Sequence, residues 1–251
     1  MQVFDLASRA VLRQFRTHAR PTHSAAFSPD KTHLASASDD TTVRLWDLAQ
    51  GEQVVRFDGH TDYARCVRPA SDDVWLSGSY DHSVRVWDAR QRGAAMTLQH
   101  GAPVEGVDVF LGGRLVAAAG GTCVALWDLA SGGRPLARMT NHQKTVTSVR
   151  AVDVRGRDGG ASVRLLSSAL DGHVKVYSLD SFKVVYAYKY PAPVLSAAVG
   201  DDLNSMAVGM ADRTLVVRKH RKPRGVIEGA GTAPLRLRVV MPLLVVYTSS
   251  A

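Results

Sequence analysis

Two segments of the chain each bring together a histidine, a serine and an aspartate, the three side chains of a hydrolase triad. One set is His18, Ser36 or Ser38, Asp40 and a following Trp46, and the other is His60, Ser77 or Ser79, Asp81 and a following Trp87. A single active site would not recur along a chain, and neither set lies in a Gly-x-Ser-x-Gly turn. The pattern therefore favours structural hydrogen bonding, and the sequence predicts no enzyme.

The sets belong to an internal repeat of about 40 residues. One marker position is held in turn by Phe4, Trp46, Trp87, Trp127, Tyr177 and Arg218, at spacings of 42, 41, 40, 50 and 41 residues. A second marker keeps step, because His18, His60, His100 and His142 precede their partners by 28, 27, 27 and 35 residues. A polar, glycine-rich insertion at 155–161 explains the long spacing and predicts an extended loop.

Each period contains short runs of β-branched or alternating residues, such as 32–38, 43–47 and 52–57, separated by turn residues. Four short strands per 40 residues resemble a blade of the WD40 β-propeller family, from the first residues to about Arg218. We therefore predict an all-β propeller with about five full blades and one partial blade. Whether its ring closes stays open. The expected domains are the blades at 1–218 and a basic linker with a poorly patterned tail at 219–251.

In the WD40 family, the His, a strand Ser or Thr, the turn Asp and the Trp form a hydrogen-bonded chain within a blade. Buried polar groups of this kind are tolerated because each one has a partner. The resemblance therefore implies a set of structural blade residues. They are His18, Asp40, Trp46, His60, Asp81, Trp87, His100, Trp127, His142, Asp171 and Tyr177.

Composition narrows the class of protein. The two cysteines, Cys66 and Cys123, are far apart, which excludes a disulfide scaffold and fits a reducing compartment. The longest apolar run, 239–247, is broken by Pro242 and is too short for a bilayer span. No nucleotide-binding loop or metal-binding motif is present, so we predict a soluble intracellular protein without cofactor or metal.

Charge is concentrated near the C-terminus. The net charge is +8, and residues 214–251 carry seven Lys and Arg against one acid. Five of these cations are Arg218, Lys219, Arg221, Lys222 and Arg224. They predict an RNA phosphate contact or a nuclear import signal, although a solvated linker would look the same. No aromatic residue interleaves them, so base stacking is not predicted.

Two tyrosines are candidate partner contacts. Tyr63 and Tyr80 fall in or near predicted turns, where propellers dock partners, and aromatic side chains are favoured anchors at interfaces. Packing against a neighbouring loop is the alternative.

Several longer strings are more specific than the repeat. They lie at 78–90, 100–105, 141–147, 170–177, 181–186, 208–210 and 217–222. Together they resemble the WD-repeat subunits of the small-subunit processome. The resemblance implies a non-catalytic nucleolar scaffold for pre-rRNA transcription and 18S rRNA processing. Its partners would be other WD-repeat subunits, the U3 small nucleolar ribonucleoprotein and pre-rRNA, with no membrane and no small-molecule substrate.

Two departures from this family bear on the expectation. The chain begins inside a repeat, and it lacks the helical C-terminal domain that the family carries, which predicts a truncated chain. The alternative function is a WD40 adaptor in another complex, either a substrate receptor of a ubiquitin ligase or a chromatin-associated scaffold.

Overall fold

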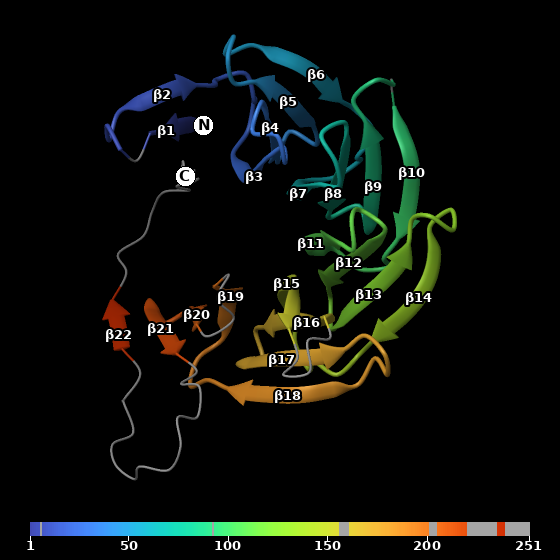
Figure 1. Cartoon of the computed structure of the whole chain (residues 1–251), viewed down its shortest axis with the longest axis vertical. Helices are drawn as coiled ribbons and strands as arrows, with labels where there is room; N and C mark the ends of the chain where they lie inside the picture. The colour runs from blue at the N-terminus through green and yellow to red at the C-terminus, as the bar shows by residue number, and fades with distance from the viewer. Residues whose placement is uncertain (6, 92, 156–160, 201–204, 220–234, 239–251) are drawn as a thin grey trace. The chain divides into compact units, whose positions relative to one another are not determined.

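The computed structural model describes residues 1–5, 7–91, 93–155, 161–200, 205–219 and 235–238. Within these ranges every regular element is a β-strand, and no helix that could cross a membrane is found (Figure 1). The strands form five four-stranded sheets and one two-stranded sheet, with antiparallel neighbours. The prediction of an all-β fold with about five full blades and one partial blade is confirmed.

The sheets follow one another along the chain. The two-stranded sheet pairs β1 (Gln2–Phe4) with β2 (Val11–Gln14). The first full sheet is β3 (Thr22–Phe27), β4 (His33–Ser38), β5 (Val43–Asp47) and β6 (Gln53–Phe57). The second is β7 (Ala64–Pro69), β8 (Val74–Ser79), β9 (Ser83–Asp88) and β10 (Ala94–Gln99). The third is β11 (Val104–Phe110), β12 (Leu115–Gly120), β13 (Cys123–Asp128) and β14 (Arg134–Met139).

The last two sheets complete the described chain. The fourth is β15 (Val146–Arg155), β16 (Ala161–Ala169), β17 (His173–Ser178) and β18 (Val184–Lys189). The fifth is β19 (Val194–Val199), β20 (Ser205–Met210), β21 (Thr214–Lys219) and β22 (Leu235–Arg238). The predicted insertion falls between β15 and β16, whose ten and nine residues lengthen this hairpin. Residues 156–160 of the insertion lie outside the described residues.

The chain divides into two compact units. Unit 1 comprises 1–120, 125–137 and 242–251, and unit 2 comprises 121–124 and 138–241. The predicted boundary at Arg218 stays a prediction. Strand β21 continues to Lys219, and β22 pairs with it through Leu235–Arg238, inside the expected tail. The other tail residues, 220–234 and 239–251, are not described.

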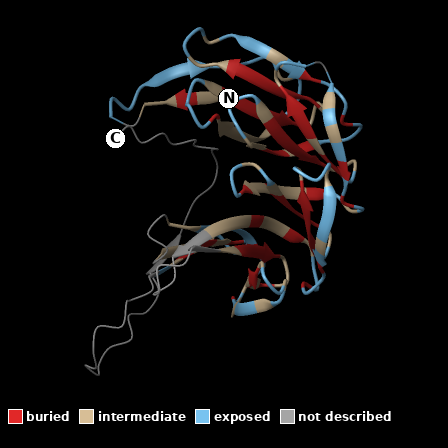
Figure 2. Ribbon diagram, turned by 45° about the vertical axis from the view of Figure 1, so that its right-hand side comes forward, coloured by how far each residue is buried: buried red, intermediate tan, exposed pale blue. Residues whose placement is uncertain are grey.

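Burial follows the position of a strand in its sheet. The second strands β4, β8 and β12 are buried along almost their whole length because apolar layers cover both of their faces. Their small residues, such as Ala35 and Ala117, allow neighbouring sheets to approach closely. The fourth strand β6 is largely exposed, as Figure 2 shows.

Packing between consecutive sheets forms the core of each unit. In unit 1, Val84 and Leu76 of the second sheet join Val104 and Val107 of the third sheet in one apolar cluster. In unit 2, a cluster that includes Val174 and Val194 joins the fourth and fifth sheets. A single sheet has two apolar faces, so each blade is stabilised by stacking on its neighbour.

Candidate functional site

The second sheet contains a complete polar chain of side chains. Trp87 Nε1 lies 2.7 Å from Ser77 Oγ, and Ser77 Oγ lies 2.7 Å from His60 Nε2. His60 Nδ1 lies 2.7 Å from Asp81 Oδ2. Ser77 is therefore the serine of this chain, whereas Ser79 Oγ donates to the carbonyl of residue 62.

The chemistry of the donors fixes the direction of these hydrogen bonds. An indole N–H can only donate, so Ser77 Oγ accepts from Trp87 and donates its own proton to His60 Nε2. His60 then carries its proton on Nδ1 and donates it to the carboxylate of Asp81. Every member of the chain therefore has a hydrogen-bond partner, and Ser77 is fully buried. A hydrolase serine must reach substrate, so this arrangement is structural.

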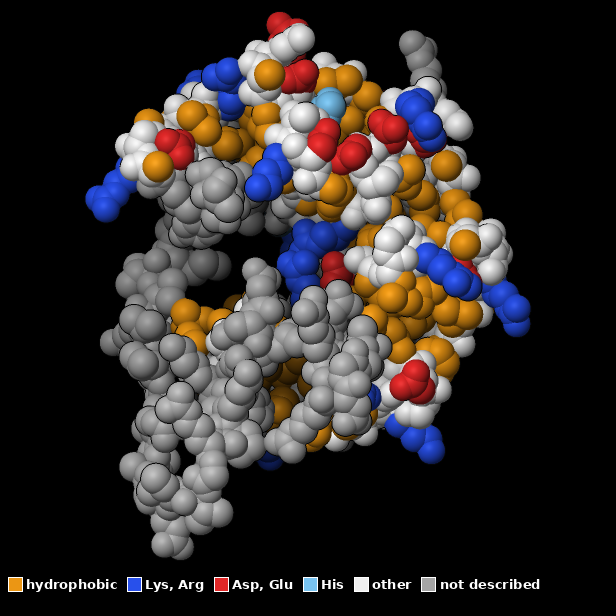
Figure 3. Space-filling view, in the orientation of Figure 1, with side chains coloured by type: hydrophobic (Ala, Val, Ile, Leu, Met, Phe, Trp, Pro, Cys, Tyr) orange, Lys and Arg blue, Asp and Glu red, His pale blue; other side chains and the backbone are white. Residues whose placement is uncertain are grey.

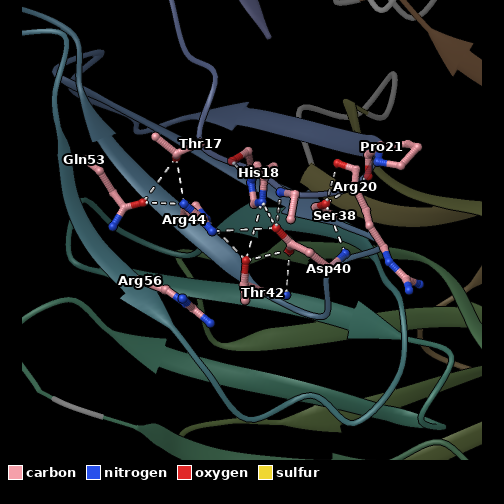
Figure 4. Close-up of polar contacts among 12 residues, drawn as sticks. Thr17, His18, Arg20, Pro21, Ser38, Asp40, Thr42, Arg44, Gln53 and Arg56 are labelled. Atoms are coloured by element: carbon pink, nitrogen blue, oxygen red, sulfur yellow. Dashed lines mark hydrogen bonds and ion pairs between the residues drawn. The ribbon is translucent and has the colours of Figure 1, made fainter.

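The same chain recurs in the first sheet, and its His, Ser and Asp members recur in the fourth sheet. In the first sheet, His18 Nδ1 lies 2.8 Å from Asp40 Oδ2 (Figure 4). His18 Nε2 lies 2.7 Å from Ser36 Oγ, and Trp46 Nε1 donates to Ser36 at 2.9 Å. Ser38 again donates to backbone carbonyls instead. In the fourth sheet the chain consists of His142, Asp171 and Ser167, with contacts of 2.9 and 2.7 Å, and buried Tyr177 holds the Trp position.

The third sheet departs from this pattern. Only Gly121 and Thr122 connect β12 to β13, whereas four residues connect β4 to β5, and this shorter turn has no aspartate. His100 Nδ1 instead lies 3.2 Å from the carbonyl oxygen of Ala102, and the imidazole lies 6.3 Å from the ring of Trp127. His100 is fully buried and Trp127 nearly so, which keeps both of them in the core.

Burial and these hydrogen bonds shift the pKa values of the aspartates and of one histidine in the polar chains. Burial alone would raise the pKa of Asp81, but hydrogen bonds from His60 and Ser83 hold this pKa well below its usual value. Burial would also raise the pKa of Asp40, but hydrogen bonds from Thr42 and His18 lower this pKa below its usual value. Burial lowers the pKa of His18 and outweighs the opposing effect of Asp40. The first chain therefore combines a neutral imidazole with an ionised carboxylate at neutral pH.

The structure also shows a cation that sequence reasoning missed. Arg44 Nη1 donates to Thr17, the residue before His18, at 2.7 Å, and Lys175 Nζ donates to the carbonyl of Asn141, the residue before His142. In the second sheet, Arg85 lies close to Gly59, the residue before His60, because a Cβ atom added to Gly59 would lie 2.8 Å from Arg85 Nη1. The sequence signal was a cation two residues before Trp46, Trp87 and Tyr177, a position that Ala125 holds before Trp127.

The two candidate contact tyrosines lie together in unit 1 but differ in their surroundings. Their ring centroids are 6.3 Å apart. Tyr80 donates to Glu105 Oε1 at 2.6 Å, and the Arg65 guanidinium lies 5.1 Å from its ring centroid. Burial and this hydrogen bond raise the pKa of Tyr80 to about 12. Tyr63 remains 38% exposed, so it offers more surface to a partner.

The fifth sheet replaces the His and Trp markers with another pair. Tyr190 stands 28 residues before Arg218, and the guanidinium carbon of Arg218 lies 5.2 Å from its ring centroid. The same carbon lies 5.5 Å from the ring centroid of Tyr188. Arg218 is the first of the five predicted basic contacts. Only the backbone of Lys219 is described, and Arg221, Lys222 and Arg224 lie outside the described residues.

No cluster of three metal-ligating side chains occurs in the part of the chain that the structure describes. Cys66 and Cys123 are buried, and burial raises the pKa of the Cys66 thiol to about 11. Both are small core residues in this structure.

Comparison with known proteins agrees with the repeat. A family model described as "WD domain, G-beta repeat" matches residues 9–47 and 51–88. The U3 small nucleolar RNA-associated protein 15 homolog of Xenopus tropicalis is 41% identical over 225 residues, which are 89% of this chain and 42% of that protein. Protein SLOW WALKER 1 of Arabidopsis thaliana is 39% identical over 91% of this chain and 43% of its own length.

The likeness extends to fungi. U3 small nucleolar RNA-associated protein 15 of Saccharomyces cerevisiae is 34% identical over 86% of this chain and 44% of its own length. The chain thus spans less than half the length of the curated relatives that it matches. The chain is a WD40-repeat protein that resembles the U3 small nucleolar RNA-associated protein 15 homologues over most of its length.

Proposed function

We propose that the chain is a non-catalytic scaffold of the small-subunit processome, where it supports pre-rRNA transcription and 18S rRNA processing in the nucleolus. One observation carries the proposal. Nine-tenths of the chain matches proteins whose names associate them with U3 small nucleolar RNA, at 41% identity for the Xenopus tropicalis protein. The match extends over 225 residues, so it rests on more than the two repeats that the general WD40 model recognises at 9–47 and 51–88.

The polar chains support a non-catalytic role. Ser36, Ser77 and Ser167 are all fully buried, and each one is hydrogen-bonded to a histidine. The Ser–His–Asp sets are therefore hydrogen-bonded within the first, second and fourth sheets. What remains at the surface is a set of loops and strand faces suited to binding other macromolecules.

The partners we propose are other WD-repeat subunits of the processome, the U3 small nucleolar ribonucleoprotein and pre-rRNA. Tyr63 is the proposed anchor for a protein partner because it is exposed beside Tyr80, which Glu105 and Arg65 hold in place. The five cations Arg218, Lys219, Arg221, Lys222 and Arg224 are the proposed RNA phosphate contacts.

Affinity purification tests this function. The tagged 251-residue chain is expressed in cells of its own organism and recovered at moderate salt. We expect enrichment of U3 small nucleolar RNA and of other WD-repeat subunits over a tagged unrelated propeller. Recovery of cullin or histone partners without U3 RNA would instead favour the adaptor alternative.

A further inference from the structure

Three tyrosines are spaced two residues apart along and after β18. Alternate residues of a strand point to the same face, so Tyr186 and Tyr188 share one side of the fourth sheet. The register places them opposite Val176 and Val174 of β17. Val174, Val176 and Tyr188 all belong to or pack against the cluster that joins the fourth and fifth sheets. The tyrosine face is therefore the face turned toward the fifth sheet.

Exposure rises steeply along this row. Tyr190 is 5% exposed, Tyr188 is half-buried, and Tyr186 is 61% exposed. This is the largest exposed fraction of any large apolar side chain in the described residues. The inner two rings are needed for the core, but the packing of the sheet does not require an aromatic ring at Tyr186.

A cation lies against the same row. The Arg218 guanidinium approaches the rings of both Tyr188 and Tyr190 from β21, while Arg218 remains exposed. Chain folding thus brings aromatic rings to the start of the basic stretch, although no aromatic residue interleaves that stretch in the sequence. Guanidinium and aromatic faces side by side are the two elements of a single-stranded nucleic-acid surface.

The charge of the surroundings selects an anionic ligand. Unit 2 contains 17 Lys and Arg against eight Asp and Glu, a net charge of +9. The described carboxylate side chains of this unit are Asp171, Asp180 and Asp212, and each one is hydrogen-bonded within its own turn. A polyanion therefore meets a field of the favourable sign.

We infer that Tyr186, Tyr188 and Arg218 form a binding surface for single-stranded RNA. A base stacks on the exposed ring of Tyr186, and Arg218, held by Tyr188, contacts a backbone phosphate. Alternate strand residues are about 6.6 Å apart, so neighbouring rings can meet separate bases of an extended strand. The inference rests on the proposed function, which places the chain in a particle that contains RNA.

The experiment compares two fluorescein-labelled probes by anisotropy, with the full 251-residue chain. One probe is a 12-nucleotide oligouridylate, and the other is an abasic ribose-phosphate chain of the same length. We expect the oligouridylate to bind more tightly. Tyr186→Ala should weaken its binding about tenfold and leave the abasic probe unaffected, because stacking needs a base. Tyr186→Phe should bind both probes like the parent chain.

A second pair of variants tests the cation. Arg218→Gln should weaken both probes and reduce the slope of log affinity against log salt by about one, as expected for one lost phosphate contact. Arg213→Gln removes an exposed arginine from the β20–β21 turn and serves as the matched control. Val185→Ala, at another exposed residue of β18, is the corresponding control for Tyr186→Ala.

The outcomes separate this surface from the proposed function. Equal affinity of Tyr186→Ala and the parent chain for oligouridylate would overturn the stacking surface. In that case, a lower salt slope after serine substitution of the five basic residues would still support the proposed RNA phosphate contact without the stacking surface. Failure of the parent chain to bind either probe would overturn the surface, while recovery of U3 RNA and WD-repeat subunits would still support the scaffold. Loss of protein partners alone in Tyr186→Ala would identify a protein-binding face instead.

Discussion

The two units are built from the same repeat but differ in charge. Unit 1 contains 14 Lys and Arg against 15 Asp and Glu, a net charge of −1, and unit 2 has a net charge of +9. Acidic and basic side chains are interspersed on the face of unit 1 seen in Figure 3. Several of them pair within the unit, as Arg114 does with Asp128 at 2.9 Å. The basic isoelectric point is therefore a property of unit 2 as a whole rather than of the last residues alone.

The units also differ in the pair of side chains at the marker positions. In the second sheet the pair is His60 and Trp87, both of them buried, whereas in the fifth sheet it is Tyr190 and an exposed Arg218. Both pairs bring the two marker positions into contact, with ring or guanidinium centres 5.8 and 5.2 Å apart. The blade therefore requires that the side chains at the two marker positions touch, but it does not require a particular pair of residue types. Where the chemistry changes from an indole to a guanidinium, the position becomes available to a ligand.

The largest expected effect on stability distinguishes Trp87 from Arg218, which hold the same marker position in two different sheets. Trp87 is fully buried and stacks on Phe57 with ring centroids 5.2 Å apart, so Trp87→Ala should cost about 3–5 kcal/mol of unfolding free energy. Arg218→Ala, at the same position of the repeat, should cost less than about 1 kcal/mol because the side chain is exposed. Urea denaturation followed by fluorescence measures both. Similar losses would show that the positions are equivalent after all.

The turn aspartates provide a smaller contrast. Asp81→Ala removes the acceptor of His60 inside the second sheet and should cost about 1–3 kcal/mol, because it leaves a buried donor without a partner. Asp212→Ala, in the exposed turn of the fifth sheet, should cost about 0.5 kcal/mol. Thermal unfolding of the two variants tests the difference. An unchanged midpoint for Asp81→Ala would refute its structural role.

Acid should weaken both units in two steps. Burial holds the pKa of His18 in unit 1 and of His142 in unit 2 below the ordinary 6.5. As the pH falls, the two histidines of the unfolded chain are protonated before those of the folded chain. Their contribution to the free energy of unfolding is therefore complete above pH 6.5 and declines below it. Hydrogen bonds lower the pKa of Asp40, Asp81 and Asp171 from 3.8 despite burial, and this stabilisation is lost as the pH falls below 3.8.

A melting series from pH 8 to pH 3 measures these steps. His18→Gln should reduce the first decline and leave the second one in place, with His33→Gln, at a half-buried site outside the three polar chains, as the control. A melting temperature that stays constant between pH 7 and pH 5 would contradict the assignment of neutral, buried imidazoles.

The fold could be predicted from the sequence because its signal is repeated. Two markers in register locate a blade without any knowledge of long-range contacts, and His60 and Trp87 did so for the second sheet. The choice between Ser77 and Ser79 could not be made, because both alternate onto the same face of β8. Only the three-dimensional path shows that Ser77 faces the histidine while Ser79 turns to a backbone carbonyl.

The candidate site was less predictable for a related reason. The basic stretch was recognised from composition, but the absence of an aromatic residue within it argued against base stacking. Tyr188 and Tyr190 approach Arg218 through sheet packing, across nearly 30 residues of sequence. Contacts between neighbouring blades are not encoded in the local pattern, so an aromatic–cation pair of this kind remains hidden until the chain is folded.

The smallest expected effect on stability concerns Tyr63 in unit 1. Its side chain is 38% exposed, so Tyr63→Ala should change the free energy of unfolding by no more than about 0.5 kcal/mol. If it anchors a protein partner, the same variant should recover fewer WD-repeat subunits in affinity purification while U3 RNA binding through unit 2 persists. Val54→Ala, which alters an exposed apolar residue of β6, is the matched control. Equal recovery from all three chains would remove Tyr63 as an anchor, and the other candidate, Tyr80, is already engaged by Glu105 and Arg65.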